Sequence, residues 1–287
     1  MTKAFVTGAT GFLGRHLLRA LQRRGIAPQG FGRSDGDVRD AEALRTAVLA
    51  AKPDWIFHMA ADTRRSRDVS LLPEMFQTNV VGTMNLLCAA QTVAPSALVA
   101  VGTFEEYGDN PTPFREDMAP RPLSPYGLTK SLASILVAGA GRSVLPATVI
   151  RFPVLYGDGQ AADTFVGGAC TAIKSGGRFP MTRGEQSRDF LYIDDAVDAL
   201  IAAAENIDVC RGEVFNACTG VALSLREAVH TIGAIAGRKD FADIGARPYR
   251  PNEQMYYVGD CTKIAQRIGW KAQTPFAEGI RKTLKSG

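Results

Sequence analysis

A tyrosine and a lysine four residues apart could carry proton transfer in this chain. They are Tyr126 and Lys130, in the run YGLTK, and a helix would place both side chains on one face. A phenol with a pKa of about 10 is a poor acid–base at neutral pH, but a nearby ammonium ion favours the phenolate. We therefore expect Lys130 to lower the pKa of Tyr126, which then exchanges a proton with a carbonyl or hydroxyl group.

A hydroxyl residue precedes this pair at the end of an apolar run. Thr103 follows the run 97–101, which has the composition of a buried strand. In a parallel sheet the carboxyl ends of the strands form the ligand crevice, where a hydroxyl can bind a substrate oxygen. Alone, such a threonine is as well read as a loop-start hydroxyl, and YxxxK alone is weak. Together they predict a catalytic set of Thr103, Tyr126 and Lys130.

A glycine turn predicts the cofactor of this chemistry. The run 8–14, GATGFLG, follows an apolar strand at 4–7 and opens a helix at Phe12. Glycines let the backbone approach a pyrophosphate, and the helix N-terminus supplies N–H donors. We expect a dinucleotide to be bound by Gly8, Thr10, Gly11, Phe12, Leu13 and Gly14. Its nicotinamide would exchange a hydride with the substrate.

The residues after the second strand bear on which dinucleotide binds. An NAD site usually carries an acidic residue here, but the chain has Arg33 and Ser34. Arg33 can pair with a 2′-phosphate, and Ser34 can donate a hydrogen bond to it. NADP, as NADPH, is therefore favoured. NAD remains the alternative because Asp35 follows directly, and Arg33 can also be read as a surface arginine.

The order of elements predicts an α/β fold with a doubly wound parallel sheet, of the Rossmann type. Short apolar runs alternate with helical periodicity through the first half. Strands are expected at 4–6, 28–32, 54–57, 97–101 and 147–150, and helices at 12–24, 41–51, 74–93 and 126–139. Residues 1–152 would form the NAD(P)-binding domain, and residues 153–287 mainly a smaller C-terminal substrate-binding lobe. A helix at 194–204 and a strand at 212–217 would return to the first domain.

The rest of the second half does not continue the alternation of strands and helices. The segments 157–188 and 238–259 are rich in glycine, proline and arginine and read as loops or a small lobe. Further helices are expected at 225–236, 261–267 and 275–284.

Composition sets limits on the class of protein. A chain of 287 residues with 46% hydrophobic residues has enough apolar mass for a core, and a net charge of +4 gives no reason to expect nucleic-acid binding. The basic run 64–67 reads as a solvated loop, or else as a phosphate or partner contact. Five scattered cysteines without a CxxC pair fit reduced thiols in a cytoplasmic protein and suggest no metal site. There is no long apolar segment, so no membrane partner is expected.

Taken together, the motifs resemble a known family, the extended short-chain dehydrogenase/reductases of the NAD(P)-dependent epimerase/dehydratase group, which act on nucleotide sugars. The matching segments span nearly the whole chain. They are 8–14, 36–40, 58–61, 79–83, 103–108, 126–130, 151–157, 188–195 and 268–270.

The resemblance implies roles at matching positions. The cofactor would be contacted at the adenine by Asp37 and Val38, at the pyrophosphate and ribose by Ala60 and Ala61, and at the nicotinamide by Pro153 and Val154. Lys130 would also hold the nicotinamide ribose. Arg188 and Arg250 match arginines that grip the substrate diphosphate, a task suited to guanidinium groups, although each can also be read as a surface ion pair. His58 is better read as a core histidine than as a catalytic one.

Departures from the family pattern bear on the reaction. Thymidine-linked 4,6-dehydratases carry Thr-Asp-Glu where this chain has Thr103, Phe104 and Glu105, and Phe104 cannot supply the proton that expels water. The segment is similar to those of 4-keto-6-deoxy-sugar reductases, so we count all three residues as substrate-binding. The leading hypothesis is an NADPH-dependent reductase of a nucleotide-linked 4-keto-6-deoxyhexose. The alternatives are a 4-epimerase or 4,6-dehydratase with retained NAD(P), and a non-catalytic NAD(P)-binding protein.

The family resemblance also implies a homodimer. Two helices per subunit, here 74–93 and 125–139, often form the interface in this group. The apolar residues of the first helix can equally be core that faces the sheet.

Overall fold

The computed structural model describes residues 1–250 and 253–285. Residues 251–252, inside the loop expected at 238–259, and residues 286–287 lie outside the described residues.

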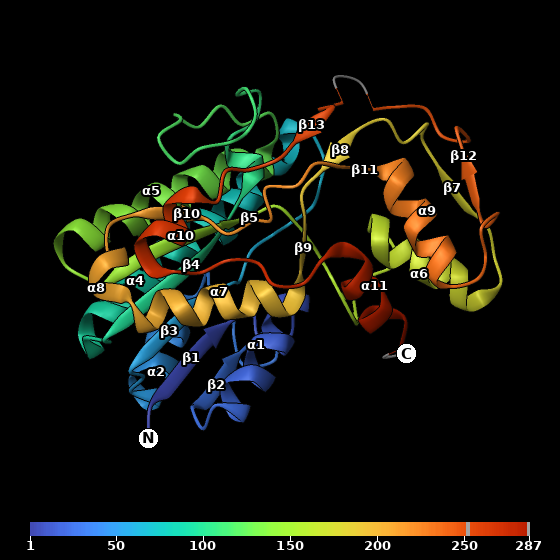
Figure 1. Cartoon of the computed structure of the whole chain (residues 1–287). Helices are drawn as coiled ribbons and strands as arrows, with labels where there is room; N and C mark the ends of the chain where they lie inside the picture. Colours follow the sequence, from blue (N-terminus) through green and yellow to red (C-terminus); the bar gives the residue numbers. More distant parts are fainter. Residues whose placement is uncertain (251–252, 286–287) are drawn as a thin grey trace.

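A six-stranded parallel sheet forms the centre of the molecule (Figure 1). The strand order is β10-β5-β4-β3-β1-β2, and every neighbouring pair is parallel. The strands are β1 (Lys3–Thr7), β2 (Ala27–Phe31), β3 (Trp55–His58), β4 (Ala97–Thr103), β5 (Ala147–Phe152) and β10 (Val214–Asn216). The expected α/β class with a parallel Rossmann-type sheet is confirmed.

Helices cover both faces of this sheet (Figure 1). One face carries α1 (Phe12–Arg23) and α7 (Ile193–Glu205), and the other carries α2 (Ala41–Ala51), α4 (Gly82–Val93) and α5 (Pro125–Ser143). The strands are therefore apolar on both sides. In β1, for example, Val6 packs into one core cluster and Phe5 into the other.

The helix expected at 74–93 is divided into three parts. It runs as α3 (Leu72–Phe76), a π-helical turn η2 (Gln77–Val81) and α4, and is preceded by the 3₁₀ turn η1 (Val69–Leu71). Such π-turns inside helices are rare and frequent at functional sites. This one carries the buried Asn79, which bonds to two other segments beside the site.

Short strands and three helices form a lobe beside the sheet (Figure 1). The strands pair as β11-β8-β13, β12-β7 and β6-β9. They are β6 (Val154–Tyr156), β7 (Phe179–Met181), β8 (Ser187–Arg188), β9 (Phe190–Tyr192), β11 (Leu223–Ser224), β12 (Ala242–Ile244) and β13 (Tyr256–Tyr257). The helices are α6 (Phe165–Ser175), α9 (Leu225–Ile235) and α11 (Phe276–Lys285).

Three short helical elements complete the described part of the chain. They are η3 (Phe104–Glu106), α8 (Ile207–Cys210) and α10 (Thr262–Ile268). Within the described residues, no helix combines the length and the apolar character that a membrane crossing needs.

Candidate active site

A cavity of about 1590 Å³ lies at the carboxyl end of the sheet, and residues of the lobe form part of its wall. Most of the residues expected to bind cofactor or substrate line it. They are Gly8, Thr10, Gly11, Phe12, Leu13, Gly14, Arg33, Asp37, Val38, Ala60, Ala61, Thr103, Glu105, Tyr126, Lys130, Pro153, Val154, Arg188 and Arg250. Two expected residues, Ser34 and Phe104, are not part of this lining.

The glycine turn forms the floor at one end of the cavity. Gly8 has a φ of +70°, and a Cβ there would lie 2.7 Å from the backbone nitrogen of Ala60. A Cβ on Gly14 would clash with the carbonyl oxygen of Gly8. Gly11 caps α1 without a side-chain acceptor, so the first-turn N–H groups face the cavity with no capping side chain. These features fit the pyrophosphate of a dinucleotide.

In the turn after β2, Arg33 and Asp35, which favour NADP and NAD respectively, have different environments. Arg33 lines the cavity, whereas the Asp35 carboxylate turns back and accepts a hydrogen bond of 2.9 Å from the Gly32 backbone N–H. The Ser34 hydroxyl donates to the same carboxylate at 3.4 Å. Ser34 and Asp35 thus bond within the turn, and the side chain presented to the cavity is a guanidinium.

Helix α5 presents the tyrosine and the lysine from its first turns. The Ser124 hydroxyl accepts a hydrogen bond of 3.1 Å from the Gly127 N–H, and Pro125 fits the first helical turn. Tyr126 and Lys130 then point from one face of the helix into the cavity.

The pKa of Tyr126 runs against the expectation from sequence. Burial raises it to about 12, although the nearby Arg65 charge works in the opposite direction. Burial also lowers the pKa of Lys130, which the Glu106 carboxylate partly offsets. The sequence predicted that Lys130 would lower the pKa of Tyr126. This prediction is wrong, because the pKa is raised overall: desolvation of the phenol outweighs the neighbouring charges.

Thr103 lies at the end of β4 and caps η3. Its backbone N–H donates a hydrogen bond of 2.8 Å to Oε1 of Glu106, and its hydroxyl accepts one of 3.3 Å from the Glu105 N–H. The side chains of Thr103 and Tyr126 line the same cavity and interact there. Thr103 and Tyr126 are therefore brought to one cavity, and their expected catalytic roles stay a prediction.

Phe104 was expected to contact substrate, but it faces the opposite way. Its side chain has no exposed surface and packs against Tyr107, Phe114 and Tyr257 at ring distances of 5.7, 5.7 and 5.9 Å. Since Thr103 and Glu105 face the cavity, the side chain between them is turned into the core. Phe104 forms part of an aromatic cluster beneath the cavity wall.

The two arginines matched to a diphosphate-binding role differ in how firmly they are held. Arg188 is mostly buried, bonds the Glu253 carboxylate at 2.6 Å and the Gln254 carbonyl at 2.8 Å, and burial lowers its pKa. Arg250 is exposed at the cavity edge. Arg188 therefore lines the cavity and also forms an ion pair.

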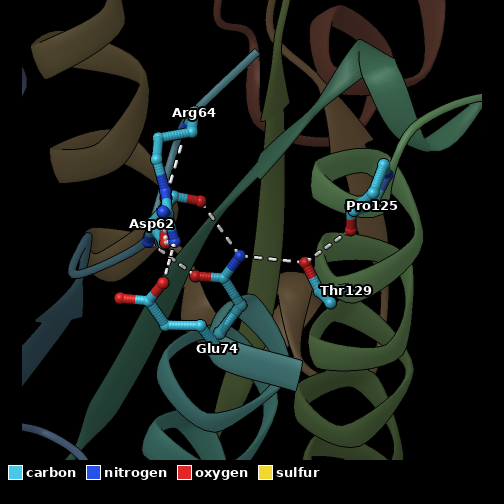
Figure 2. A network of polar contacts seen from close by, with 6 residues as sticks. Asp62, Arg64, Glu74, Pro125 and Thr129 are labelled. Carbon is cyan, nitrogen blue, oxygen red and sulfur yellow. Dashed lines mark hydrogen bonds and ion pairs between the residues drawn. The ribbon is translucent and has the colours of Figure 1, made fainter. Parts of the chain in front are cut away.

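The basic run 64–67 divides into residues with different environments. Arg64 is ion-paired with Asp62 and with Glu74 at 2.6 Å, as Figure 2 shows. The neighbouring Arg65 lines the cavity, where its charge acts on Tyr126. Sequence reasoning had no means to distinguish these adjacent arginines.

A polar network holds this loop against the helix of Tyr126 (Figure 2). Asn79 accepts a hydrogen bond of 2.7 Å from the Asp62 N–H and donates one of 2.9 Å to the Thr129 hydroxyl. Thr129 in turn donates to the Pro125 carbonyl at 2.9 Å. The network fixes the loop after β3 relative to the start of α5.

His58 is a structural residue, in line with the reading from sequence. Its ring lies between the hydroxyls of Thr7 at 2.7 Å and Thr83 at 2.9 Å, and it is almost fully buried. Burial lowers the pKa of His58 to about 3, so the ring is neutral at physiological pH.

Comparison with known proteins identifies the family. Residues 4–218 match the NAD dependent epimerase/dehydratase family. The chain belongs to this family and is an enzyme of that kind, which confirms the resemblance found in the sequence.

Two relatives that match 99% of the chain have different named activities. UDP-glucose 4-epimerase of Mycolicibacterium smegmatis is 31% identical over 99% of this chain and 97% of its own length. dTDP-glucose 4,6-dehydratase 1 of Escherichia coli is 27% identical over 99% of this chain and 92% of its own.

Solved structures share the fold. UDP-glucose 4-epimerase of Thermus thermophilus, in complex with NAD, has a TM-score of 0.86 at 26% identity, and the match covers 99% of this chain and 98% of that chain. RMD of Pseudomonas aeruginosa, in complex with NADPH, has a TM-score of 0.88 at 24% identity and covers 99% and 98%. The neighbours thus include an NAD complex and an NADPH complex.

Proposed function

We propose that this chain is an NADPH-dependent reductase of a nucleotide-linked 4-keto-6-deoxyhexose. The observation that carries the proposal is that Thr103, Tyr126 and Lys130 line one cavity with Arg33, a guanidinium group that suits the 2′-phosphate of NADPH. A protonated phenol beside a second hydroxyl suits donation of a proton to a ketone oxygen. A reaction that begins by oxidising the sugar needs the phenolate instead.

The cofactor preference rests on the turn after β2. Arg33 faces the cavity, and Arg39, held by Asp37 at 2.9 Å, lies in the same lining. Two guanidinium groups suit a 2′-phosphate, and the Asp35 carboxylate that would favour a free ribose is bonded to the turn. The first turn of α1 would hold the pyrophosphate, and Lys130 the nicotinamide ribose.

The substrate would lie between the sheet and the lobe. Arg188 and Arg250 would bind its diphosphate, as guanidinium groups do in bidentate geometry. Thr103, Tyr126 and Glu105 would surround the sugar. A charged diphosphate at one end orients the ketone at the other, so that much of the catalysis is positioning.

The chemistry divides between the bound cofactor and the chain. NADPH, when bound, supplies a hydride to C4 of the sugar. Tyr126 donates its proton to the ketone oxygen, and Thr103 donates a hydrogen bond to that oxygen as charge develops. Lys130, as an ammonium ion, stabilises the phenolate that remains until it takes a proton from solvent.

A retained-cofactor epimerase or 4,6-dehydratase is the second candidate. It is favoured by the named activities of the relatives and by Glu105, an acid that lines the cavity beside Thr103. The buried Phe104 argues against the dehydratase chemistry that uses an acid at that position. A non-catalytic NAD(P)-binding protein would not need the convergence of Thr103, Tyr126 and Lys130.

We also propose that the chain forms a homodimer in the cytoplasm. Met84 on α4 is 47% exposed and Ile135 on α5 is 56% exposed, and the two helices are neighbours. Light scattering should give twice the mass of the chain, and the pair M84E with I135E should give a monomer. A monomeric wild-type chain would exclude the dimer.

Reduction is tested directly with purified protein, NADPH and 4-keto-6-deoxyhexoses linked to thymidine, guanosine or cytidine diphosphate. Loss of NADPH absorbance in step with a 4-hydroxy product supports the proposal. Tyr126→Phe should bind NADPH normally and lose most turnover. A variant with near-normal rates would contradict the role of Tyr126.

A further inference from the structure

Tyr257 brings a second phenol to the cavity from the far end of the chain. It lies on β13 of the lobe and is only 8% exposed, yet it is part of the cavity lining. One side of its ring packs against Phe104 and Phe114, at 5.9 and 5.5 Å, and the Arg188 guanidinium lies 5.7 Å from the ring centre. The small part of Tyr257 that remains accessible therefore opens into the cavity.

The hydroxyl of Tyr257 meets the catalytic pair. Thr103, Tyr126 and Tyr257 line the same cavity, and Tyr257 packs on Phe104, the residue that follows Thr103. The Thr103 side chain interacts with both phenols, and the two phenols interact electrostatically. Glu105 and Arg65 act on both phenols as well. Hydroxyl side chains from β4, α5 and β13 thus line one cavity together with the Glu105 carboxylate and the Arg65 guanidinium.

A buried tyrosine hydroxyl needs a partner, whereas a ring that only fills space does not. Phenylalanine would serve the packing of Tyr257 equally well, as Phe104 and Phe114 do beside it. Burial raises the pKa of Tyr257, so its hydroxyl stays protonated and is a donor at neutral pH. Because Tyr257 lines the cavity and interacts with Thr103 and Tyr126, its hydroxyl is available to a substrate oxygen bound beside those two residues.

We propose that Tyr257 is a further catalytic residue, whose hydroxyl donates a hydrogen bond to the reacting C4 oxygen of the sugar. The inference rests on the proposed function, because it places that oxygen beside Thr103 and Tyr126. In the reduction, the hydride forms the new C–H bond at C4 and the proton of Tyr126 forms the O–H bond. Tyr257 keeps its proton throughout and stabilises the negative charge that develops on the oxygen.

The test is Tyr257→Phe, which removes one hydroxyl and keeps the ring that packs on Phe104 and Phe114. The loss of a single preorganised donor of this kind costs about 100-fold or more in kcat. Because Thr103 and Tyr126 remain, we expect kcat to fall at least about tenfold, with kcat/KM falling in parallel and KM little changed. Rates are normalised to NADPH-binding sites, so that unfolded protein does not count.

Tyr256→Phe is the matched control, since Tyr256 is the next residue and is 59% exposed. It should leave kcat, KM and NADPH affinity unchanged. A kcat for Tyr257→Phe within about twofold of wild type, or a rise in KM alone, overturns the inference. The first result would show no catalytic role, and the second would show a binding contact that does not strengthen in the transition state.

Failure of the proposed function would look different. If Tyr126→Phe is inactive and Tyr257→Phe is normal, only the role of Tyr257 is wrong. If the wild-type chain epimerises or dehydrates instead of reducing, the reductase assignment is wrong. The two variants are then compared on that reaction, which also passes through a ketone. A kcat that falls in Tyr257→Phe and not in Tyr256→Phe still supports the inference.

Discussion

The backbone N–H of Thr103 donates a hydrogen bond of 2.8 Å to Oε1 of Glu106, a carboxylate whose side chain has no exposed surface. Oε2 of the same carboxylate accepts hydrogen bonds from the buried Arg151, at 2.8 Å from Nε and 2.7 Å from a terminal nitrogen. A Cβ on Gly102 would lie 2.7 Å from Oε1 of Glu106, so glycine is required for this approach. Thr103, the proposed hydrogen-bond donor to the substrate, is thus positioned by the buried Glu106–Arg151 ion pair behind it.

Glu106→Gln should destabilise the fold strongly. Removal of one charge from a buried pair leaves Arg151 without its counterion, at a cost of about 3–5 kcal/mol in the free energy of unfolding. Urea titration measures this cost. Glu42→Gln is the control, because Glu42 pairs with Arg45 on the surface and its loss should shift the midpoint little. Equal midpoints for the two variants would contradict a stabilising role of the Glu106 pair.

The alkaline limb of the reductase pH profile should report Lys130. Burial lowers the pKa of Lys130, while the pKa of Tyr126 is raised to about 12. Reduction needs both groups protonated, so kcat/KM should fall as pH rises through the lowered pKa of Lys130, below the ordinary lysine value of about 10.4. Lys130→Arg should move this limb to higher pH. A rate that instead rises with pH through the neutral range would indicate a phenolate base and an oxidative first step.

Arg33→Ala should weaken NADPH binding selectively. Loss of a guanidinium that pairs with a 2′-phosphate is expected to raise the Kd for NADPH about tenfold or more, since charge-assisted bonds contribute about 1.5–3 kcal/mol. The Kd for NADH should barely change. Fluorescence titration with both cofactors measures the ratio, and Arg33→Lys should lie between the two proteins. Equal losses for NADPH and NADH would place Arg33 away from the 2′-position.

His58 should make the fold sensitive to mild acid. The pKa of His58 is lowered to about 3 in the folded chain, whereas an unfolded histidine has a pKa of about 6.5. The unfolded state therefore binds the extra proton first as the pH falls. Stability should decrease below pH of about 6.5, by up to about 1.4 kcal/mol per pH unit. Urea midpoints at pH 7 and 5 measure this slope, and it should be smaller in His58→Gln. An unchanged slope in the variant would assign it to other groups.

The sheet could be predicted from the sequence because most of its strands are short apolar runs separated by amphipathic helices. The glycine turn, Thr103, Tyr126 and Lys130 were readable because each sits at a fixed offset from such a run. Helix α6 was not predicted, since the segment 157–188 has a loop-like composition. Its start is fixed by Thr164, whose hydroxyl accepts a hydrogen bond of 3.2 Å from the Gly167 N–H.

The sequence analysis missed some residues of the cavity because tertiary contacts, and not local sequence patterns, bring them there. Tyr257 reaches the cavity through β13, and Arg65 through a loop fixed by Asn79 in a π-helical turn. Phe104 was misplaced because one residue of η3 must face inward when Thr103 and Glu105 face the cavity. The pKa of Tyr126 was misjudged because burial cannot be read from a four-residue spacing.

A reductase of the proposed kind binds NADPH and releases its oxidised form at each turnover. The most direct test is to denature the freshly purified protein, search for released nucleotide by mass spectrometry, and titrate the native protein with NADPH and NADH. We predict no stoichiometric nucleotide and tighter binding of NADPH than of NADH. Protein that carries one NAD per chain would contradict the account and indicate an epimerase or dehydratase that retains its cofactor.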